Sequence, residues 1–296
     1  MDELLIKTRD ERVLEVATVG DPHGATVLFH HGTPGSKCSF SMLAPLAESG
    51  EFFLVTTSRA GYGSSDRKRG RDVADVVDDT NAVLDALGRG RYLSVGWSGG
   101  GPHALACAAL GAPRCLAAWS LAGVAPIDVD FDWAEGMGPE NVAEFERARI
   151  GGEAHETAIA EIADTLADAN EDNVIELFEG LLSNVDKDAL ADERVRREFA
   201  RAIGYAFARG DGGYFDDDHA FMNPWGFSVT DAAAPVEIWF GDDDLMVPAS
   251  HGRWLAANLP GARERFFASE GHVSLIVNHL DELARSWRAH LSVAAL

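Results

Sequence analysis

The chain has 296 residues, of which 46% are hydrophobic and 25% are charged, the composition of a globular protein and not of a disordered or collagen-like one. Its formal net charge of −23 argues against binding to nucleic acid or to an anionic membrane surface, because both require a basic face. The lack of a long apolar run, of a basic signal-peptide start and of metal-type cysteine spacing predicts a cytoplasmic, metal-free protein whose three cysteines are reduced.

Short apolar runs and helix-like stretches alternate along the first 125 residues. This alternation is typical of βαβ units, which build a mostly parallel sheet covered by helices on both faces. One intervening stretch has apolar residues at helical spacing from Val73 to Leu87, with Asp72 as the expected N-cap and Gly88 as the stop. The predicted strands are Val13–Val19, Val27–Phe29, Phe52–Val55, Tyr92–Gly96 and Ala117–Leu121.

From about Ile127 to Phe221, acidic amphipathic helices replace the strand signal. Most of the negative charge lies here, since Pro126–Trp225 contains 25 acidic and 8 basic residues. A solvated helical surface accounts for this charge; salt adaptation and attraction of a cationic substrate are the alternatives. We interpret the run Asp216–Asp218 as a solvated helix N-terminus. The predicted helices are Asn141–Ile150, Glu153–Ala169, Asn173–Leu182 and Arg194–Ala208.

The strand rhythm returns after the helical block. A helical block inside an α/β pattern indicates an insertion and not a second independent fold. We therefore divide the chain into a first core segment (residues 1–126), a helical insertion (127–225) and a second core segment (226–296). The last predicted elements are strands at Val236–Phe240 and Arg265–Phe267 and a closing helix over Ser274–His290.

The most informative motif is Gly-x-Ser-x-Gly, formed by Gly96, Ser98 and Gly100 between a predicted strand and a predicted helix. A nucleophile on a sharp strand-to-helix turn has a strained backbone, and side chains two residues to either side would collide there. Glycine is therefore favoured at both flanking positions. This setting makes Ser98 the candidate nucleophile.

A nucleophilic serine needs a base, an orienting acid and donors for the oxyanion. His272, past the last predicted strand, is the candidate base. The candidate acid lies in the triplet Asp242–Asp244, which follows the strand before it. The backbone N–H groups of Gly99 and Thr33 are the expected oxyanion donors.

Several other residues near these motifs have two possible roles. Trp97, beside the nucleophile, and Trp225, at the end of the helical block, are candidate substrate-binding residues, with core packing as the alternative. His30 and His31 precede the oxyanion loop, and we expect them to bond the loop backbone. We expect Arg59 to hold its own loop through its guanidinium group.

Five motifs in this order resemble those of the α/β-hydrolase fold family, and they cover nearly the whole chain. The resemblance implies an α/β-hydrolase fold in which the insertion 127–225 is a helical cap that shapes the substrate pocket. The family's acid motif, Gly-x-x-Asp-x-x-Val-Pro, matches residues 241–248, and this match implies that Asp244 is the triad acid. The motifs are HGTPGS (31–36), SRAGYGSSD (58–66), GWSGGGPHA (96–104), GDDDLMVP (241–248) and EGHVSL (270–275).

Within that family the motifs look like those of carboxylesterases and proline-iminopeptidase-like enzymes. They differ from true proline iminopeptidases, which have HGGPG where this chain has Thr33, and from dehalogenases and epoxide hydrolases, whose nucleophile is Asp. The resemblance implies a cofactor-independent serine hydrolase that takes a small acyl substrate, most simply a carboxylic ester. The alternatives are a proline-iminopeptidase-like aminopeptidase and a non-catalytic binding protein of the same fold.

Overall fold

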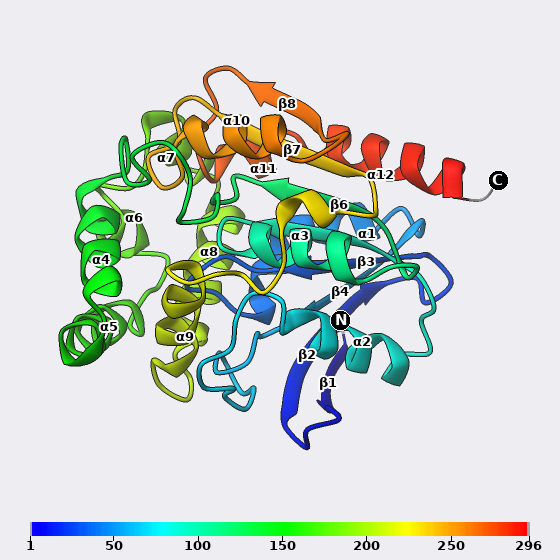
Figure 1. Cartoon of the computed structure of the whole chain (residues 1–296), viewed down its shortest axis with the longest axis horizontal. Coiled ribbons are helices and arrows are strands. Elements are labelled where there is room, and N and C mark those ends of the chain that lie inside the picture. The colour runs from blue at the N-terminus through cyan, green and yellow to red at the C-terminus, as the bar shows by residue number, and fades with distance from the viewer. Residues whose placement is uncertain (1, 295–296) are drawn as a thin grey trace.

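The computed structural model describes residues 2–294, and its centre is one eight-stranded sheet in the order β1-β2-β4-β3-β5-β6-β7-β8 (Figure 1). Strand β2 runs antiparallel to both of its neighbours, and all the other pairs are parallel. The strands are β1 Asp2–Lys7, β2 Val13–Gly20, β3 Ala25–His30, β4 Phe52–Thr57, β5 Tyr92–Trp97, β6 Cys115–Leu121, β7 Val236–Gly241 and β8 Arg263–Phe267.

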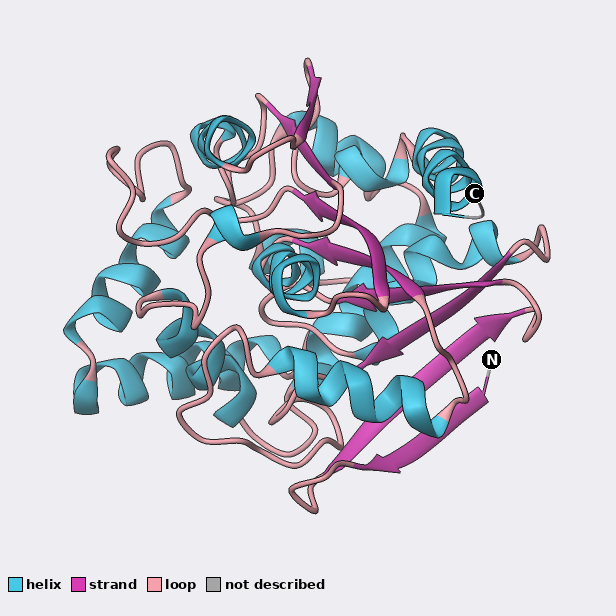
Figure 2. Cartoon of the chain, turned by 45° about the vertical axis from the view of Figure 1, so that its right-hand side comes forward, coloured by secondary structure: helices cyan, strands magenta, loops and turns pink. Residues whose placement is uncertain are grey.

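Helices cover both faces of this sheet, as the alternating sequence predicts (Figure 2). Helices α2 (Val76–Ala86) and α3 (Gly100–Leu110) pack against each other on one face. Helices α1 (Ala44–Ala47) and α12 (Leu280–Ala294) meet on the other. The remaining core helices are η1 Lys37–Leu43, η2 Val229–Asp231, α10 Ala249–Asn258 and α11 Ser274–Val277.

Two predicted boundaries are wrong. Helix α2 begins at Val76 and not at Val73, because Asp72 accepts a hydrogen bond from the backbone N–H of Asp75 and closes a turn before the helix. Gly88, in the left-handed region at φ 66°, does follow the end of the helix, as predicted. The closing helix is divided into α11 and α12, with a break at residues 278–279.

Six α-helices lie between β6 and β7 in the described part of the chain. Helices α4, α5 and α6 stand beyond the end of the sheet, at the left of Figure 1, whereas α8 packs on η1 of the core. The predicted helix over 173–182 is only one turn long, and helix α7 was not predicted. Helix α9 begins at Gly212, so the run Asp216–Asp218 lies inside it and not at its N-terminus. The six are α4 Pro139–Ile150, α5 Gly152–Leu166, α6 Val174–Leu177, α7 Asn184–Ala189, α8 Glu193–Ala206 and α9 Gly212–Phe221.

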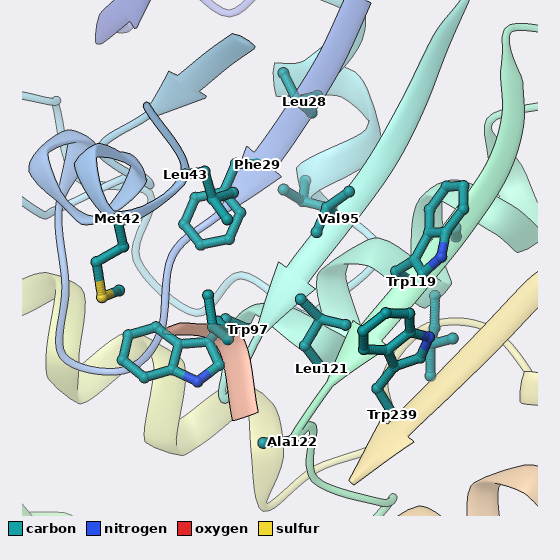
Figure 3. Packing of buried hydrophobic residues seen from close by; sticks show 14 of the residues in the cluster. Leu28, Phe29, Met42, Leu43, Val95, Trp97, Trp119, Leu121, Ala122 and Trp239 are labelled. Carbon is teal, nitrogen blue, oxygen red and sulfur yellow. The ribbon is translucent and has the colours of Figure 1, made fainter. Parts of the chain in front are cut away.

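The hydrophobic core lies around the central strands (Figure 3). Strands β5 and β7 are buried along their whole length, which explains their mainly apolar sequences. Trp119 on β6 and Trp239 on β7 are each 1% exposed or less. Burial of a large side chain such as these contributes roughly 1.5–3 kcal/mol. The core therefore holds the ends of β5 and β7, where the candidate site residues follow, in a rigid frame.

Two further features concern the apolar character of the helices and the state of the cysteines. Between residues 2 and 294, no helix combines the length and the apolar character that crossing a membrane requires. Cys38, Cys107 and Cys115 are buried thiols outside any disulfide.

Candidate active site

Ser98 lies on the sharp turn between β5 and α3, in left-handed backbone with φ 56°. The flanking glycines are needed because backbone approaches them closely. A Cβ on Gly96 would lie 2.0 Å from the carbonyl oxygen of Gly100, and one on Gly100 would lie 2.0 Å from that of His30. No side chain fits at such distances. The turn therefore has the strand–turn–helix geometry that exposes a nucleophile.

Ser98 faces a cavity of about 370 Å³, which Thr33 and Gly99 also line. Most of the wall comes from the helices α4–α9 between β6 and β7, which are called the cap below, and from the loop after β7. The wall is mainly apolar. Its apolar members include Phe145, Ile162, Leu177, Phe178, Phe221 and Met246. The cavity suits an apolar group attached to a polar centre at Ser98.

Asp244 and His272 are in direct hydrogen-bond contact. His272 Nδ1 lies 2.8 Å from Asp244 Oδ2, and both side chains are buried. The other carboxylate oxygen of Asp244 accepts hydrogen bonds from the N–H groups of Met246 and Val247, each at 2.8 Å. Asp242 instead accepts from the N–H of Ser269 at 2.6 Å. Of the aspartate triplet, Asp244 is therefore the residue that orients His272.

Trp97 links this pair to the serine turn. It precedes Ser98 in the chain, its indole N–H donates to the His272 carbonyl at 3.1 Å, and the two rings lie 5.2 Å apart. Burial by itself lowers the pKa of His272, but the nearby carboxylates of Asp244 and Asp186 outweigh burial and raise it. The two carboxylates therefore stabilise the protonated form of the His272 imidazole.

Asp186, on cap helix α7, is a site residue that the sequence analysis missed. Its buried carboxylate accepts hydrogen bonds from the N–H groups of His272, Val273 and Ser274 at 2.7–3.0 Å. A Cβ on Gly271 would lie 2.3 Å from the Asp186 carboxylate. The sequence signal, a serine three residues before an aspartate, indicates only a helix N-terminus. The structure adds a contact from the cap to the backbone of His272.

Replacing Asp186 with asparagine is expected to lower kcat/KM by about tenfold or more, the cost of a lost charged hydrogen-bond partner. A histidine that acts as a base accepts a proton only when neutral, so if His272 is the base, activity rises with pH through its pKa. The Asp186 charge raises that pKa, and its loss is expected to move the acid limb of the pH profile to lower pH. Asp188→Asn, an exposed change on the same helix, is the control. An unshifted acid limb in Asp186→Asn contradicts this role.

The loop that carries Thr33 is held by hydrogen bonds from His31, as predicted, and from Arg59. The prediction that the Arg59 guanidinium holds its own loop is wrong, because its partners lie in the oxyanion loop and at Asp217. The Arg59 guanidinium donates to the carbonyls of His31 and Gly32. His31 Nδ1 lies 2.7 Å from the Gly32 carbonyl, and its Nε2 accepts from the Arg59 backbone N–H. The prediction for His30 is wrong, because its ring bonds the Ser94 hydroxyl on β5 and not the loop. Burial lowers the pKa of both histidines, which stay neutral.

The aspartate run of the cap is not a solvated helix end. Asp216, Asp217 and Asp218 are each at most 1% exposed, because α9 packs against α4 and α5 and two of these aspartates pair with arginines of the loop after β4. Their carboxylates pair with buried or half-buried partners, which are Arg67 for Asp216, Arg59 and Arg71 for Asp217, and His155 for Asp218. Within residues 2–294, no group of three or more His, Cys, Asp or Glu is arranged to hold a metal ion.

The two tryptophans proposed as substrate-binding residues do not line the cavity at Ser98. Trp97 is 5% exposed and packs beneath the site with Phe29, Met42 and Leu43 (Figure 3). Trp225 is 3% exposed and lies against Phe227. Neither is among the residues that line the cavity at Ser98. Both are core residues, which is the alternative that the sequence left open.

A comparison with known protein families matches residues 25–279 to the model of the alpha/beta hydrolase fold. Among curated proteins, epoxide hydrolase B of Mycobacterium tuberculosis is 30% identical over 131 residues, which is 43% of this chain. The match spans only 35% of that enzyme's length.

Solved structures are similar over almost the whole chain. An alpha/beta hydrolase fold protein from Nakamurella multipartita has a TM-score of 0.67 at 20% identity, with 98% of each chain covered. A thermophilic esterase from Thermogutta terrifontis has a TM-score of 0.69 at 19% identity, covering 99% of this chain and 98% of that one. The enol-lactonase from Burkholderia xenovorans has a TM-score of 0.64 at 20% identity, covering 98% and 100%. At these identities the likeness concerns the fold.

Proposed function

The chain belongs to the alpha/beta hydrolase fold family, and we propose that it is a cofactor-independent serine hydrolase that cleaves carboxylic esters. One observation carries the proposal. A serine held in left-handed backbone at the end of β5 faces a cavity, and its neighbour Trp97 contacts the histidine of a buried His272–Asp244 pair. A nucleophile, a base and an orienting acid are the parts of acyl transfer.

In the proposed reaction Ser98 attacks the ester carbonyl carbon while His272 takes the serine proton. Asp244 accepts a hydrogen bond from His272 Nδ1, which holds the imidazole tautomer and stabilises the imidazolium. The N–H groups of Thr33 and Gly99 bind the oxyanion of the tetrahedral intermediate. His272 then protonates the leaving alcohol, and afterwards it activates the water that releases the acid from Ser98.

The apolar wall of the cavity supports an acyl or alcohol group of moderate size as the part of the substrate that is buried. Structural neighbours described as esterases and as an enol-lactonase agree with an ester substrate. The curated relative is described as an epoxide hydrolase. Ser98 argues against that chemistry here, because epoxide hydrolases have Asp as the nucleophile in the motif that this chain resembles.

A fluorophosphonate probe followed by mass spectrometry tests the proposal directly. The expected result is one covalent adduct, located on Ser98, together with turnover of aryl acetates and butyrates. A protein that neither reacts with the probe nor turns over any ester is the result expected of a non-catalytic binding protein, and it would overturn the proposal.

A second candidate, an aminopeptidase, is favoured by the charges on the cavity wall. Glu140, Glu144 and Glu161 line the cavity, and no lysine, arginine or histidine is among its lining residues within the described chain. Glu144 is buried, and burial together with Asp218 raises its pKa well above the usual range. With Glu144 neutral, the groups that could attract a substrate amine are the exposed carboxylates of Glu140 and Glu161.

Salt dependence separates these two substrates. Neutral aryl esters are expected to keep a nearly constant kcat/KM as salt rises from low ionic strength to above 0.1 M, where the Debye length is ~10 Å. If the cavity carboxylates capture an amine, aminoacyl arylamides are the better substrates and their KM rises with salt. We expect the first result. A clear preference for aminoacyl arylamides over acetate and butyrate esters would replace the ester proposal with the aminopeptidase.

A further inference from the structure

A fully buried carboxylate of the cap contacts the loop that carries Thr33. Asp217, on α9, is 0% exposed. Its Oδ2 accepts hydrogen bonds from the Thr33 hydroxyl at 2.6 Å, from the Tyr62 hydroxyl at 2.9 Å and from the Arg59 guanidinium at 2.5 Å. Its Oδ1 lies 2.6 Å from Arg71. Burial favours the neutral acid, but Arg59 and Arg71 hold the pKa of Asp217 well below its usual range, so the carboxylate is charged.

The direction of the Thr33 N–H depends on the other end of the same peptide unit. The Gly32 carbonyl accepts hydrogen bonds from Arg59 at 2.9 Å and from His31 at 2.7 Å. In a planar trans peptide the carbonyl and the N–H point in opposite directions. By fixing the Gly32 carbonyl, Arg59 therefore fixes the N–H of Thr33. Its positive charge at the carbonyl also polarises the peptide and strengthens that N–H as a donor.

Arg59 keeps this place only with a counter-charge. It is 4% exposed, and a buried guanidinium without a carboxylate partner is strongly unfavourable. Asp217 supplies that partner from the cap, and it holds the Thr33 side chain at the same time. The contact therefore ties two parts of the oxyanion loop to helix α9.

We propose that Asp217 is a positioning residue for the reaction: it holds Arg59 and Thr33 so that the Gly32–Thr33 peptide keeps its N–H in the oxyanion site. Asp217 is not among the residues that line the cavity, so it acts through these two neighbours. The inference rests on the proposed function, because the direction of this N–H matters only if an oxyanion forms next to Ser98.

The test compares Asp217→Asn with Asp216→Asn in the full-length protein. Asp216 is a buried carboxylate on the same helix, but it pairs with Arg67 and has no contact with the oxyanion loop. Asp217→Asn is expected to lower kcat for an aryl butyrate by about 10- to 100-fold, somewhat less than the loss of a whole oxyanion donor. KM is expected to change little, because the donor acts mainly on the tetrahedral state. Asp216→Asn is expected to retain the wild-type kcat.

The affinity for a tetrahedral analogue is a second measurement, and a general loss of stability does not change it in a protein that is still folded. Phenylboronic acid forms a tetrahedral adduct with an active serine, so its inhibition constant is expected to rise in Asp217→Asn in parallel with the fall in kcat. Circular dichroism and the melting temperature report whether each variant is folded. A folded Asp217→Asn whose kcat and boronate affinity match those of Asp216→Asn would overturn the inference.

A milder pair of variants decides the question if Asp217→Asn does not fold. Thr33→Val keeps the shape of the side chain and the backbone N–H, but it removes the hydroxyl that donates to Asp217. It is expected to lower kcat about tenfold, and Thr33→Ser is expected to restore most of that loss. Equal kcat in Thr33→Val and the wild type would overturn the inference. Failure of the wild type to label at Ser98 would instead overturn the proposed function.

Discussion

Ser98→Ala is expected to abolish ester hydrolysis and covalent labelling while leaving the fold intact. The nucleophilic Oγ is lost, and in a serine hydrolase the loss of this atom lowers kcat by about 10⁶-fold. The backbone at φ 56° is unfavourable for alanine and for serine alike, so the turn itself is unchanged. Initial rates with an aryl butyrate, together with intact-protein mass after reaction with the fluorophosphonate, measure both effects.

Ser269→Ala is the matched control for this change. Ser269 also lies in left-handed backbone, at φ 60°, but it is exposed and does not line the cavity. Its variant is expected to show the same small change in melting temperature as Ser98→Ala and to keep its activity. A fluorophosphonate adduct on any residue other than Ser98 in the wild type would contradict the assignment of the nucleophile.

Asp244→Asn is expected to lower kcat by about 10⁴-fold, because an amide in this place can stabilise the wrong tautomer of the His272 imidazole. The structure explains why neighbouring aspartates do not compensate. Asp242 is engaged with the Ser269 N–H, and Asp243 is exposed. The measurement is the pH profile of kcat for each asparagine variant.

Asp242→Asn is the comparison that tests the choice within the triplet. It removes one charge from the same loop while leaving the 2.8 Å contact between Asp244 and His272 in place. We expect it to change kcat by less than about tenfold, the range of a single loop hydrogen bond. If Asp242→Asn is the more damaging variant, Asp244 is not the orienting acid.

Local features of the fold could be predicted because each depends on nearby residues. The buried strands appear as apolar runs, and the turn at Ser98 requires glycine within two positions on either side. Strand β1 was missed because its apolar run, Leu4–Ile6, is short and is flanked by charged residues; the strand lies at the edge of the sheet, and only Ile6 is buried. The start and the burial of helix α9 were missed because it is buried around most of its surface, and its acidic residues hide any amphipathic pattern.

The role of charged residues in the cap could not be predicted for a different reason. The partners of Asp217 and Asp186 lie far away in sequence, at Arg59 and at His272, and a chain of carboxylates looks the same whether it is solvated or buried. What decides between the two is the packing of α7 and α9 on the core. The sequence did contain one signal, a cluster of arginines in residues 59–71. This segment has fewer acidic residues than arginines, which indicates that some of the arginines pair with carboxylates from elsewhere in the chain.

The hydrogen bonds that Asp186 on α7 accepts from the backbone at His272 have a consequence for protein engineering. One way to change the substrate choice of such a protein is to build a chimera in which the cap is replaced by the cap of another hydrolase. Such a chimera would lose the carboxylate that accepts hydrogen bonds from the N–H groups of His272, Val273 and Ser274. The loss is avoided only if the transplanted cap has an aspartate in the place of Asp186. A graft that retains helix α7 and replaces only α4 and α5, which supply much of the cavity wall, would alter selectivity and leave the base in its place.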